Sequence, residues 1–250
     1  MKRAPPVGPN SATGKSASDY IMAAKIEDYA LIGDCETAAL VDRNGSINWL
    51  CWPDFSSEAC FAALLGAEEN GYWKITPTKG KWKTTRRYRP HTLILETIFE
   101  HKHGSFRLID FMPVRQRNSH VVRIVEGIRG RIDVRMELAL RFGYGRTVPW
   151  VTHIKNGIRA IAGPNLALLR ASVPMHGENM KTVADFTVSR GKRVSFSLAY
   201  GISYKPNRFG AYEPTLVGRP RSFPCGALPS GKSPWKFACL DDRSLVGFAK

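Results

Sequence analysis

Acidic residues are scarce in this chain of 250 residues: 21 Asp and Glu stand against 37 Lys and Arg, and the formal net charge is +16. The sequence also lacks an apolar run of about 18 residues, so it predicts no transmembrane helix. The first 25 residues are rich in Pro, Ser, Gly and Ala and have no apolar stretch of the secretory-signal type. We therefore expect a disordered leader over residues 1–25, a cytoplasmic location and no membrane partner.

Metal-binding and nucleotide-binding patterns are missing as well. The cysteines are odd in number and form no CxxC pair, which favours isolated thiols over a disulfide framework or a zinc site; they are Cys35, Cys51, Cys60, Cys225 and Cys239. His101 and His103 share one face of an expected strand but have no third ligand nearby. None of GxSxG, GxGxxG or GxxxxGKS/T occurs. The sequence predicts neither a metal nor a cofactor.

The positive charge makes nucleic acid a partner class to be weighed. Lys and Arg are spread along the whole chain, and only residues 79–89, KGKWKTTRRYR, form a dense run. Its interleaved aromatics, Trp82 and Tyr88, are of the kind on which single-stranded nucleic acids stack. No recognised nucleic-acid motif surrounds them. We interpret the run as a solvated strand or loop face and keep a basic nucleic-acid binder as the least favoured alternative.

Alternating hydrophobicity predicts an all-β fold from about residue 26 to 204. Residues 131–141 form the clearest strand, with apolar residues on one face and charged residues on the other. We expect the preceding run, 120–128, to pair with it across Arg129-Gly130. Asn-Gly dipeptides at 44–45 and 156–157 predict type I′ hairpins. Further strands are expected at 71–75, 92–101, 105–111, 166–172, 183–189 and 193–200, and together they favour a large antiparallel sandwich.

One short helix and an irregular tail complete the expected organisation. Ser56 or Ser57 can cap a helix whose first turn holds Glu58, and Gly66 stands where that helix would end. After about Tyr204 the composition changes, because residues 206–250 contain six prolines and five glycines without sustained alternation. We expect 205–250 to be irregular and poorly ordered, and to be either a truncated or a frameshifted continuation.

Candidate catalytic groups form no recognisable constellation. Glycoside hydrolysis needs two carboxyl groups that face each other across a cleft, and sequence neighbours such as Asp34 and Glu36 rarely converge in that way. The segment RFGYGR follows the clearest strand, and its glycines permit a bulge or a tight corner. There Arg141, Tyr144 and Arg146 could stack on or pair with a ligand, and a purely structural corner is the alternative.

An aromatic loop is the remaining candidate. Trp49, Trp52, Pro53 and Phe55 lie within seven residues, and aromatic planes can stack on sugar rings or anchor one domain against another. Strand alternation places Trp49 in the core, whereas the other three are expected at the surface. The candidates for substrate proximity or domain docking are Trp52, Pro53, Asp54, Phe55 and Ser56.

Longer segments of the chain carry a family resemblance. They are IEDYALIGDCETAALVDRNGSINWLCWPDFSSEACFAALLG (26–66), GYWKITP (71–77), RRYRPHTLILET (86–97), IDFMPVR (109–115), VVRIVEGIRG (121–130), MELALRFGYGRTVPW (136–150), AGPNLALLR (162–170) and SFSLAYG (195–201). In this order, over about 175 residues, they resemble the N-terminal domain of bacterial and archaeal family-fifteen glycoside hydrolases, the glucoamylase and trehalase-like proteins.

The resemblance implies an antiparallel super-sandwich followed by an (α/α)6 barrel. In that barrel a general-acid Glu and a general-base Glu hydrolyse an α-glucosidic bond with inversion. The loop that resembles WPDFSS is expected to lie against the barrel near the rim of its pocket. Ser56 departs from the family pattern, which has Asp there, so a charge that could orient the barrel or substrate is missing. The barrel has no counterpart before Lys250, and its two catalytic Glu residues have no positions to be carried onto.

We therefore predict an N-terminal β-sandwich domain, residues 26–204, of a glucoamylase or trehalase-like glycoside hydrolase, inactive by itself. The alternative is a free-standing β-sandwich that binds a partner protein or a carbohydrate such as an α-glucan or α-glucoside. Without the barrel, the loop aromatics are expected to form a sticky patch and to cause self-association.

Overall fold

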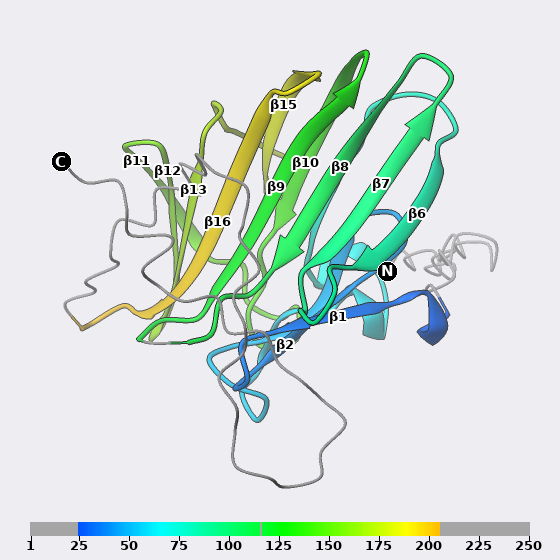
Figure 1. The fold of residues 1–250 in the computed structure, drawn as a ribbon. Coiled ribbons are helices and arrows are strands. Elements are labelled where there is room, and N and C mark those ends of the chain that lie inside the picture. The colour runs from blue at the N-terminus through cyan, green and yellow to red at the C-terminus, as the bar shows by residue number, and fades with distance from the viewer. Residues whose placement is uncertain (1–24, 116, 206–250) are drawn as a thin grey trace, which may run out of the picture.

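Two antiparallel β-sheets packed face to face make up the protein (Figure 1). The computed structural model describes residues 25–115 and 117–205. The first sheet, sheet A, follows the order β1 (Ala30–Gly33), β2 (Ala38–Val41), β3 (Ser46–Cys51), β5 (Tyr72–Pro77), β10 (Arg131–Ala139), β15 (Lys181–Ser189) and β14 (His176–Glu178), and β4 (Ala59–Phe61) pairs with β3. The predicted antiparallel super-sandwich is confirmed.

The second sheet, sheet B, also contains eight strands. Their order is β11 (Trp150–Ile154), β12 (Gly157–Ala162), β13 (Asn165–Ala171), β16 (Arg193–Ile202), β9 (His120–Arg129), β8 (Gly104–Phe111), β7 (Leu95–His101) and β6 (Lys83–Tyr88). Short 3-10 turns occupy Ile26–Asp28, Ala63–Leu65 and Glu68–Asn70. No helix among the described residues is long and apolar enough to span a membrane.

A single large apolar core fills the space between the sheets. Alternate residues of β10, namely Ile132, Val134, Met136 and Leu138, are buried in it, as the sequence pattern predicts. One charged pair crosses this core. Arg123 on β9 donates to both carboxylate oxygens of Asp110 on β8 and to the backbone carbonyls of Gly45 and Trp73 in sheet A. The pair therefore ties the two sheets together.

The prediction of a helix after Ser56 and Ser57 is wrong. Residues 59–61 form β4, whose side chains are all buried, and a 3-10 turn follows at 63–65. Both faces of this segment are covered, so its Ala-rich composition reflects tight packing rather than an amphipathic helix. Pairing of β4 with β3 satisfies its backbone groups, and this tertiary contact overrides local helix propensity.

The predicted pairing of 120–128 with 131–141 is also wrong. β9 pairs with β8 and β16 in sheet B, whereas β10 pairs with β5 and β15 in sheet A. The chain crosses between sheets at Gly130, which has a φ of 72°. A Cβ atom there would lie 2.2 Å from the carbonyl oxygen of His103. Only glycine suits this crossing, and the link between the strands is a corner instead of a hairpin.

Both Asn-Gly sites do connect neighbouring strands, but neither forms the predicted type I′ turn. Gly45 has a φ of 78° while Asn44 has no positive φ, and Asp42 accepts the backbone N–H groups of Asn44 and Ser46. This geometry is that of a longer loop closed by a left-handed glycine. In the second hairpin Asn156 takes the positive φ and Gly157 already begins β12.

The dense basic run is a solvated strand, as interpreted from the sequence. Its C-terminal half forms β6, an edge strand of sheet B whose residues are exposed or half-buried. The expected disordered leader and the expected irregular tail fall on residues 1–24 and 206–250, which lie outside the described residues.

Candidate functional site

The Trp52 loop, residues 52–57, lies between β3 and β4 at one end of the sandwich. Trp52 is only 2% exposed, and its indole N–H donates to Ser119 Oγ at 2.9 Å. Its ring also lies 5.8 Å from that of Tyr200 on sheet B. The expectation that Trp52 is exposed is therefore wrong: the indole packs in the core because its N–H finds a partner on the segment that leads into β9.

A carboxylate and a guanidinium hold the base of this loop. Asp34 Oδ2 accepts hydrogen bonds from Ser119 Oγ at 2.6 Å and from Arg115 at 3.0 and 3.1 Å. Arg115 also donates to the carbonyl of Pro53 and pairs with Glu36 at 2.9 Å. Because the partners come from three separate segments, the loop leaves the sandwich from a rigid base. The base is preorganised for binding, since few groups need reordering.

The tip of the loop presents an aromatic ring to solvent. Asp54 Oδ1 accepts from the backbone N–H of Ser56 at 3.1 Å and from the hydroxyl groups of Ser56 and Ser57 at 2.8 and 2.9 Å. These hydrogen bonds lower the pKa of Asp54, so its carboxylate is ionised and committed to its own loop. Phe55 beside it is 65% exposed. The tip thus exposes Phe55 to solvent, and its carboxylate, Asp54, is not placed to act as a catalytic acid.

The RFGYGR corner packs beside the loop. Tyr144 donates its backbone N–H to Ala59 at 3.1 Å, and its ring lies 6.1 Å from that of Trp49. Trp49 itself is half-buried and packs against a small cluster that includes Ala59. The prediction that Trp49 belongs to the core is therefore only partly correct. Arg146 is exposed at the same corner. The structure therefore brings Tyr144 and Arg146 to the sandwich end that carries the Trp52 loop.

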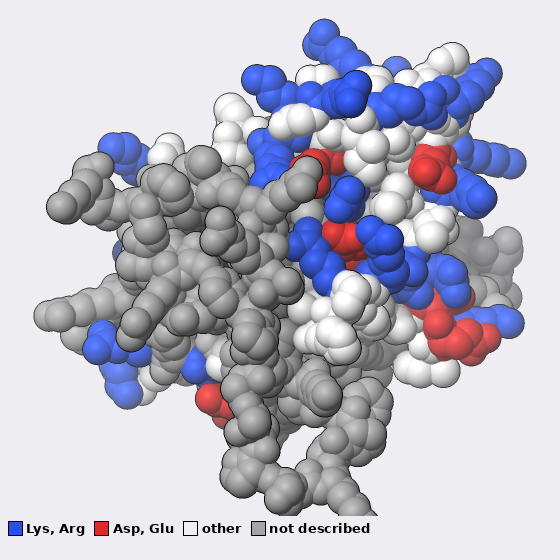
Figure 2. Space-filling model, viewed as in Figure 1, with Lys and Arg blue, Asp and Glu red and all other residues white. Residues whose placement is uncertain are grey.

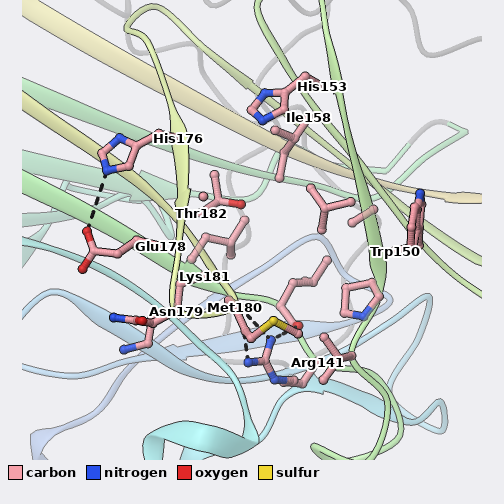
Figure 3. A pocket seen from close by; sticks show the side chains of 17 residues that line it. Arg141, Trp150, His153, Ile158, His176, Glu178, Asn179, Met180, Lys181 and Thr182 are labelled. Carbon is pink, nitrogen blue, oxygen red and sulfur yellow. Dashed lines mark hydrogen bonds and ion pairs between the residues drawn. The ribbon is translucent and has the colours of Figure 1, made fainter.

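Arg141 lines a cavity of about 520 Å³. The cavity lies between β10, β14 and β15 of sheet A and β11 and β12 of sheet B, as Figure 3 shows. His153 and Ile158 stand on one wall, His176 and Glu178 on the opposite one, and Arg141 at the bottom. Leu138, Leu140, Ile158 and Ala160 make much of the lining apolar.

The charge of Arg141 has no acidic partner among the described residues. Its guanidinium donates to the backbone carbonyls of Leu140 at 2.8 Å and Met180 at 3.3 Å, and the side chain forms none of the described salt bridges. The residue is 9% exposed, and burial lowers the pKa of Arg141. By contrast, Arg115 and Arg123 each pair with an aspartate. A buried cation without a counter-ion is a donor prepared for an anionic oxygen.

No group of three or more His, Cys, Asp or Glu side chains that could hold a metal occurs within residues 25–115 and 117–205. His101 and His103 lie with their rings 5.3 Å apart, and Trp82 lies 5.2 Å from His101. The two histidines therefore belong to a small aromatic group near the start of β8.

Sequence reasoning missed the residues that fix the loop. Asp34 and Ser119 lie 85 positions apart, and Arg115 reaches Asp34 across 81 positions. No local pattern could bring them together. The one local signal is Asp34 itself, because an acidic residue just before an expected hairpin often accepts the backbone N–H groups of the residues that follow, as Asp34 does from Glu36 and Thr37.

Comparison with known proteins identifies relatives for most of the described residues. The model of the family described as "Trehalase-like, N-terminal" matches residues 20–207. A trehalase of Thermoplasma volcanium is 34% identical over 144 residues, which cover 53% of this chain and 22% of that protein. Trehalase 1 of Sulfolobus acidocaldarius is 32% identical over 128 residues, or 51% of this chain and 22% of the relative.

A third relative matches a shorter segment more closely. A trehalase of Mycolicibacterium smegmatis is 39% identical over 75 residues, which cover 30% of this chain and 11% of that protein. The matched part of this chain thus spans about a fifth or less of each of these three relatives.

Proposed function

Because the chain belongs to the trehalase-like N-terminal domain family, we propose that it serves as the non-catalytic β-sandwich of a trehalase-type glycoside hydrolase. Its partner is a catalytic domain that supplies the two carboxyl groups of α-glucosidic hydrolysis. The family match over residues 20–207 is the observation that carries this proposal. Trehalases among the relatives support trehalose as the first substrate to test.

The Trp52 loop and the RFGYGR corner form the docking edge in this proposal. Phe55 offers an exposed aromatic ring on a rigid base, and Tyr144 is an exposed aromatic residue at the same end of the sandwich. Aromatic side chains that are held in place lose little conformational entropy on binding, and such residues dominate many interfaces. Arg141 extends the edge into the cavity, where a carboxylate of the docked domain would neutralise its buried charge.

Four of the described carboxylates fit a supporting role better than a catalytic one. Asp34 and Glu36 pair with Arg115, Asp110 pairs with Arg123, and Asp54 accepts hydrogen bonds from its own loop. An inverting hydrolase needs one carboxyl that can donate a proton and one that can activate water. Carboxylates held by arginines or by serine hydroxyls serve neither purpose.

Reconstitution tests the proposal. The full chain is to be co-expressed with the Thermoplasma volcanium trehalase from which the matched N-terminal segment has been removed. We expect the two polypeptides to co-purify and to release glucose from trehalose, whereas the full chain alone releases none from trehalose, maltose or starch. Failure to associate would refute docking. Glucose release by the full chain alone would refute the non-catalytic role.

A matched pair of substitutions locates the docking edge. Phe55→Ser is expected to weaken the association by roughly fivefold or more, because truncating an interface aromatic commonly costs above about 1 kcal/mol. Ile26→Ser is the control, since Ile26 is 72% exposed and lies before β1, at the other end of that strand from Asp34. Equal weakening by both variants would contradict the proposed edge.

A further inference from the structure

The cavity beside Arg141 opens at one edge of the sandwich, between β14, the edge strand of sheet A, and β11, the edge strand of sheet B. Four apolar residues of its lining remain exposed to solvent, and they are Val148, Trp150, Val151 and Met180. Trp150 is 77% exposed and Met180 70% exposed. Single exposed apolar residues are ordinary, but a group of them around a cavity is typical of a ligand-binding site.

The turn that carries Met180 has an unusual backbone. Glu178 lies opposite Lys181, so Asn179 and Met180 form a two-residue turn between β14 and β15, and their φ angles are 49° and 60°. Gly or Asn is favoured where φ is positive, and a side chain such as that of Met costs roughly 1 kcal/mol there. The exposed Met180 side chain regains little of this cost by burial. A residue held in this way at the opening of a cavity suggests a role in binding.

The guanidinium of Arg141 keeps one edge free for a ligand. Its Nη1 donates to the carbonyls of Leu140 at 2.8 Å and Met180 at 3.3 Å, and its Nη2 donates to the same Met180 carbonyl at 3.3 Å. That carbonyl oxygen therefore lies on the side between the two terminal nitrogens. The opposite edge consists of Nε and the outer Nη2 hydrogen, and no hydrogen bond between described residues uses Nε. Two parallel N–H groups of this kind match the two oxygens of a carboxylate.

Other charged groups of the cavity already have partners. Lys181 lies 3.7 Å from the carboxylate of Glu137, and Glu178 pairs with Arg135 at 2.7 Å. Arg141 thus supplies the unpaired positive charge, which suits a monoanion better than a dianion such as phosphate. The apolar part of the lining also disfavours a ligand that must keep its water.

The charged face, the part of sheet B over β6, β7 and β8, shows how arginines are neutralised elsewhere in the protein. There Glu96 accepts hydrogen bonds from Arg87, Arg89 and Arg107. Figure 2 shows acidic side chains set among Lys and Arg. Carboxylates of the chain therefore pair with arginines that are partly in water, whereas Arg141, in an apolar cavity, has no such partner among the described residues. A bound ligand can supply the missing negative charge.

We propose that the cavity binds a small organic monocarboxylate with an apolar body. The carboxylate accepts hydrogen bonds from the free edge of Arg141, the body lies against Ile158 and Ala160, and Trp150 packs on it at the opening (Figure 3). A volume of about 520 Å³ and a largely apolar lining with one orienting polar group are typical of small-molecule sites. This site goes beyond the proposed docking role, because a carboxylate of a docked domain would use Arg141 and leave most of the cavity unfilled.

Dansylglycine is the probe, since it joins a carboxylate to an aromatic group whose fluorescence rises in apolar surroundings. We expect the full chain to bind it saturably, with a dissociation constant below about 1 mM. The uncharged dansylglycinamide should bind roughly tenfold or more weakly, because hydrogen bonds between charged groups are the strong ones. Phenylbutyrate should displace the probe and inorganic phosphate should not. The chain is tested alone, so the result does not depend on whether it docks on a catalytic domain.

Arg141→Met should weaken the binding of dansylglycine by roughly tenfold or more and leave that of dansylglycinamide unchanged. Arg159→Met is the matched control. Arg159 is exposed on β12 and points away from the cavity, because its neighbours Ile158 and Ala160 line it.

Trp150→Ser tests the opening of the cavity and decides the question if Arg141→Met does not fold. It should weaken the binding of both probes by about threefold or more, since an aromatic contact is lost. Ile26→Ser is its control, because Ile26 is also exposed and precedes β1, at the opposite edge of sheet A from β14.

Four results would overturn the proposal. They are the absence of saturable binding, equal binding of dansylglycine and its amide, displacement by phosphate as effective as that by phenylbutyrate, and equal effects of Arg141→Met and Arg159→Met. Unchanged binding by Trp150→Ser would overturn the assignment of the ligand to this cavity.

Discussion

Replacing Arg123 by Met is expected to destabilise the protein by about 3–5 kcal/mol, the usual cost of removing one partner from a buried ion pair. Arg123 and Asp110 both have fully buried side chains, and their closest contact is 2.8 Å. The substitution leaves the Asp110 carboxylate in the core without its partner. It also removes the donors to Gly45 and Trp73, which join sheet B to sheet A.

The assay is urea denaturation at neutral pH followed by tryptophan fluorescence. Arg193→Met is the matched control, because Arg193 pairs with Glu126 at 2.7 Å on the partly exposed outer face. An exposed pair of this kind contributes about 0–1 kcal/mol. High salt should weaken the Arg193 pair and leave the Arg123 pair unchanged, since a buried pair is poorly screened.

The double variant Arg123→Met with Asp110→Leu decides whether the reasoning is correct. Removing both charges leaves no uncompensated ion, so the double variant should be clearly more stable than Arg123→Met alone. The reasoning fails if the single variant costs less than about 1 kcal/mol, or if the two substitutions are additive. If Arg123→Met does not fold, a double variant that does fold would support the same conclusion.

Two further predictions concern the charged face and the Trp52 loop. Although burial acts in the opposite direction, hydrogen bonds from Arg89 and Arg107 lower the pKa of Glu96 below its ordinary 4.5. Ionised Glu96 therefore stabilises the fold above that pH, and the stabilisation is lost as the pH falls through the lowered pKa. Glu96→Gln should reduce the free energy of unfolding at neutral pH and flatten its decline in acid, which urea midpoints across pH will show. Trp52→Ser should destabilise the fold by about 3–5 kcal/mol, whereas Phe55→Ser should change it by no more than about 0.5 kcal/mol in the same assay.

The fold could be predicted from the sequence where one face of a strand is polar. In β10 the charged Asp133, Arg135 and Glu137 are exposed or half-buried on the face away from the core, so alternation marks the buried residues correctly. In β9 apolar residues occupy both faces, and periodicity then says only that a strand is present. The corner at Gly130 places β10 in the other sheet from β9. This explains why the predicted pairing of these two strands is wrong.

The candidate site was harder to predict because its contacts are distant in sequence. Trp52 stands next to Pro53 in a polar, turn-rich segment, which made it an exposed residue by local criteria. Its burial depends on Ser119, 67 positions away, and on Asp34, which orients that serine. Phe55, three positions on, has no such partner and stays exposed. The loop therefore contains one core residue and one surface residue that composition alone does not separate.

The main outward apolar surface lies on the sheet and not on the loop for the same reason. A sticky patch made of Trp52, Pro53 and Phe55 reduces to Phe55 and part of Pro53 once Trp52 is buried. One exposed phenylalanine is ordinary on a protein surface and does not by itself cause self-association. The larger apolar area faces outward from sheet B, and strand periodicity could not mark it, because a strand covered on both sides looks the same in sequence wherever its cover comes from. Any tendency of this domain to associate should therefore depend on that face of sheet B, and much less on the Trp52 loop.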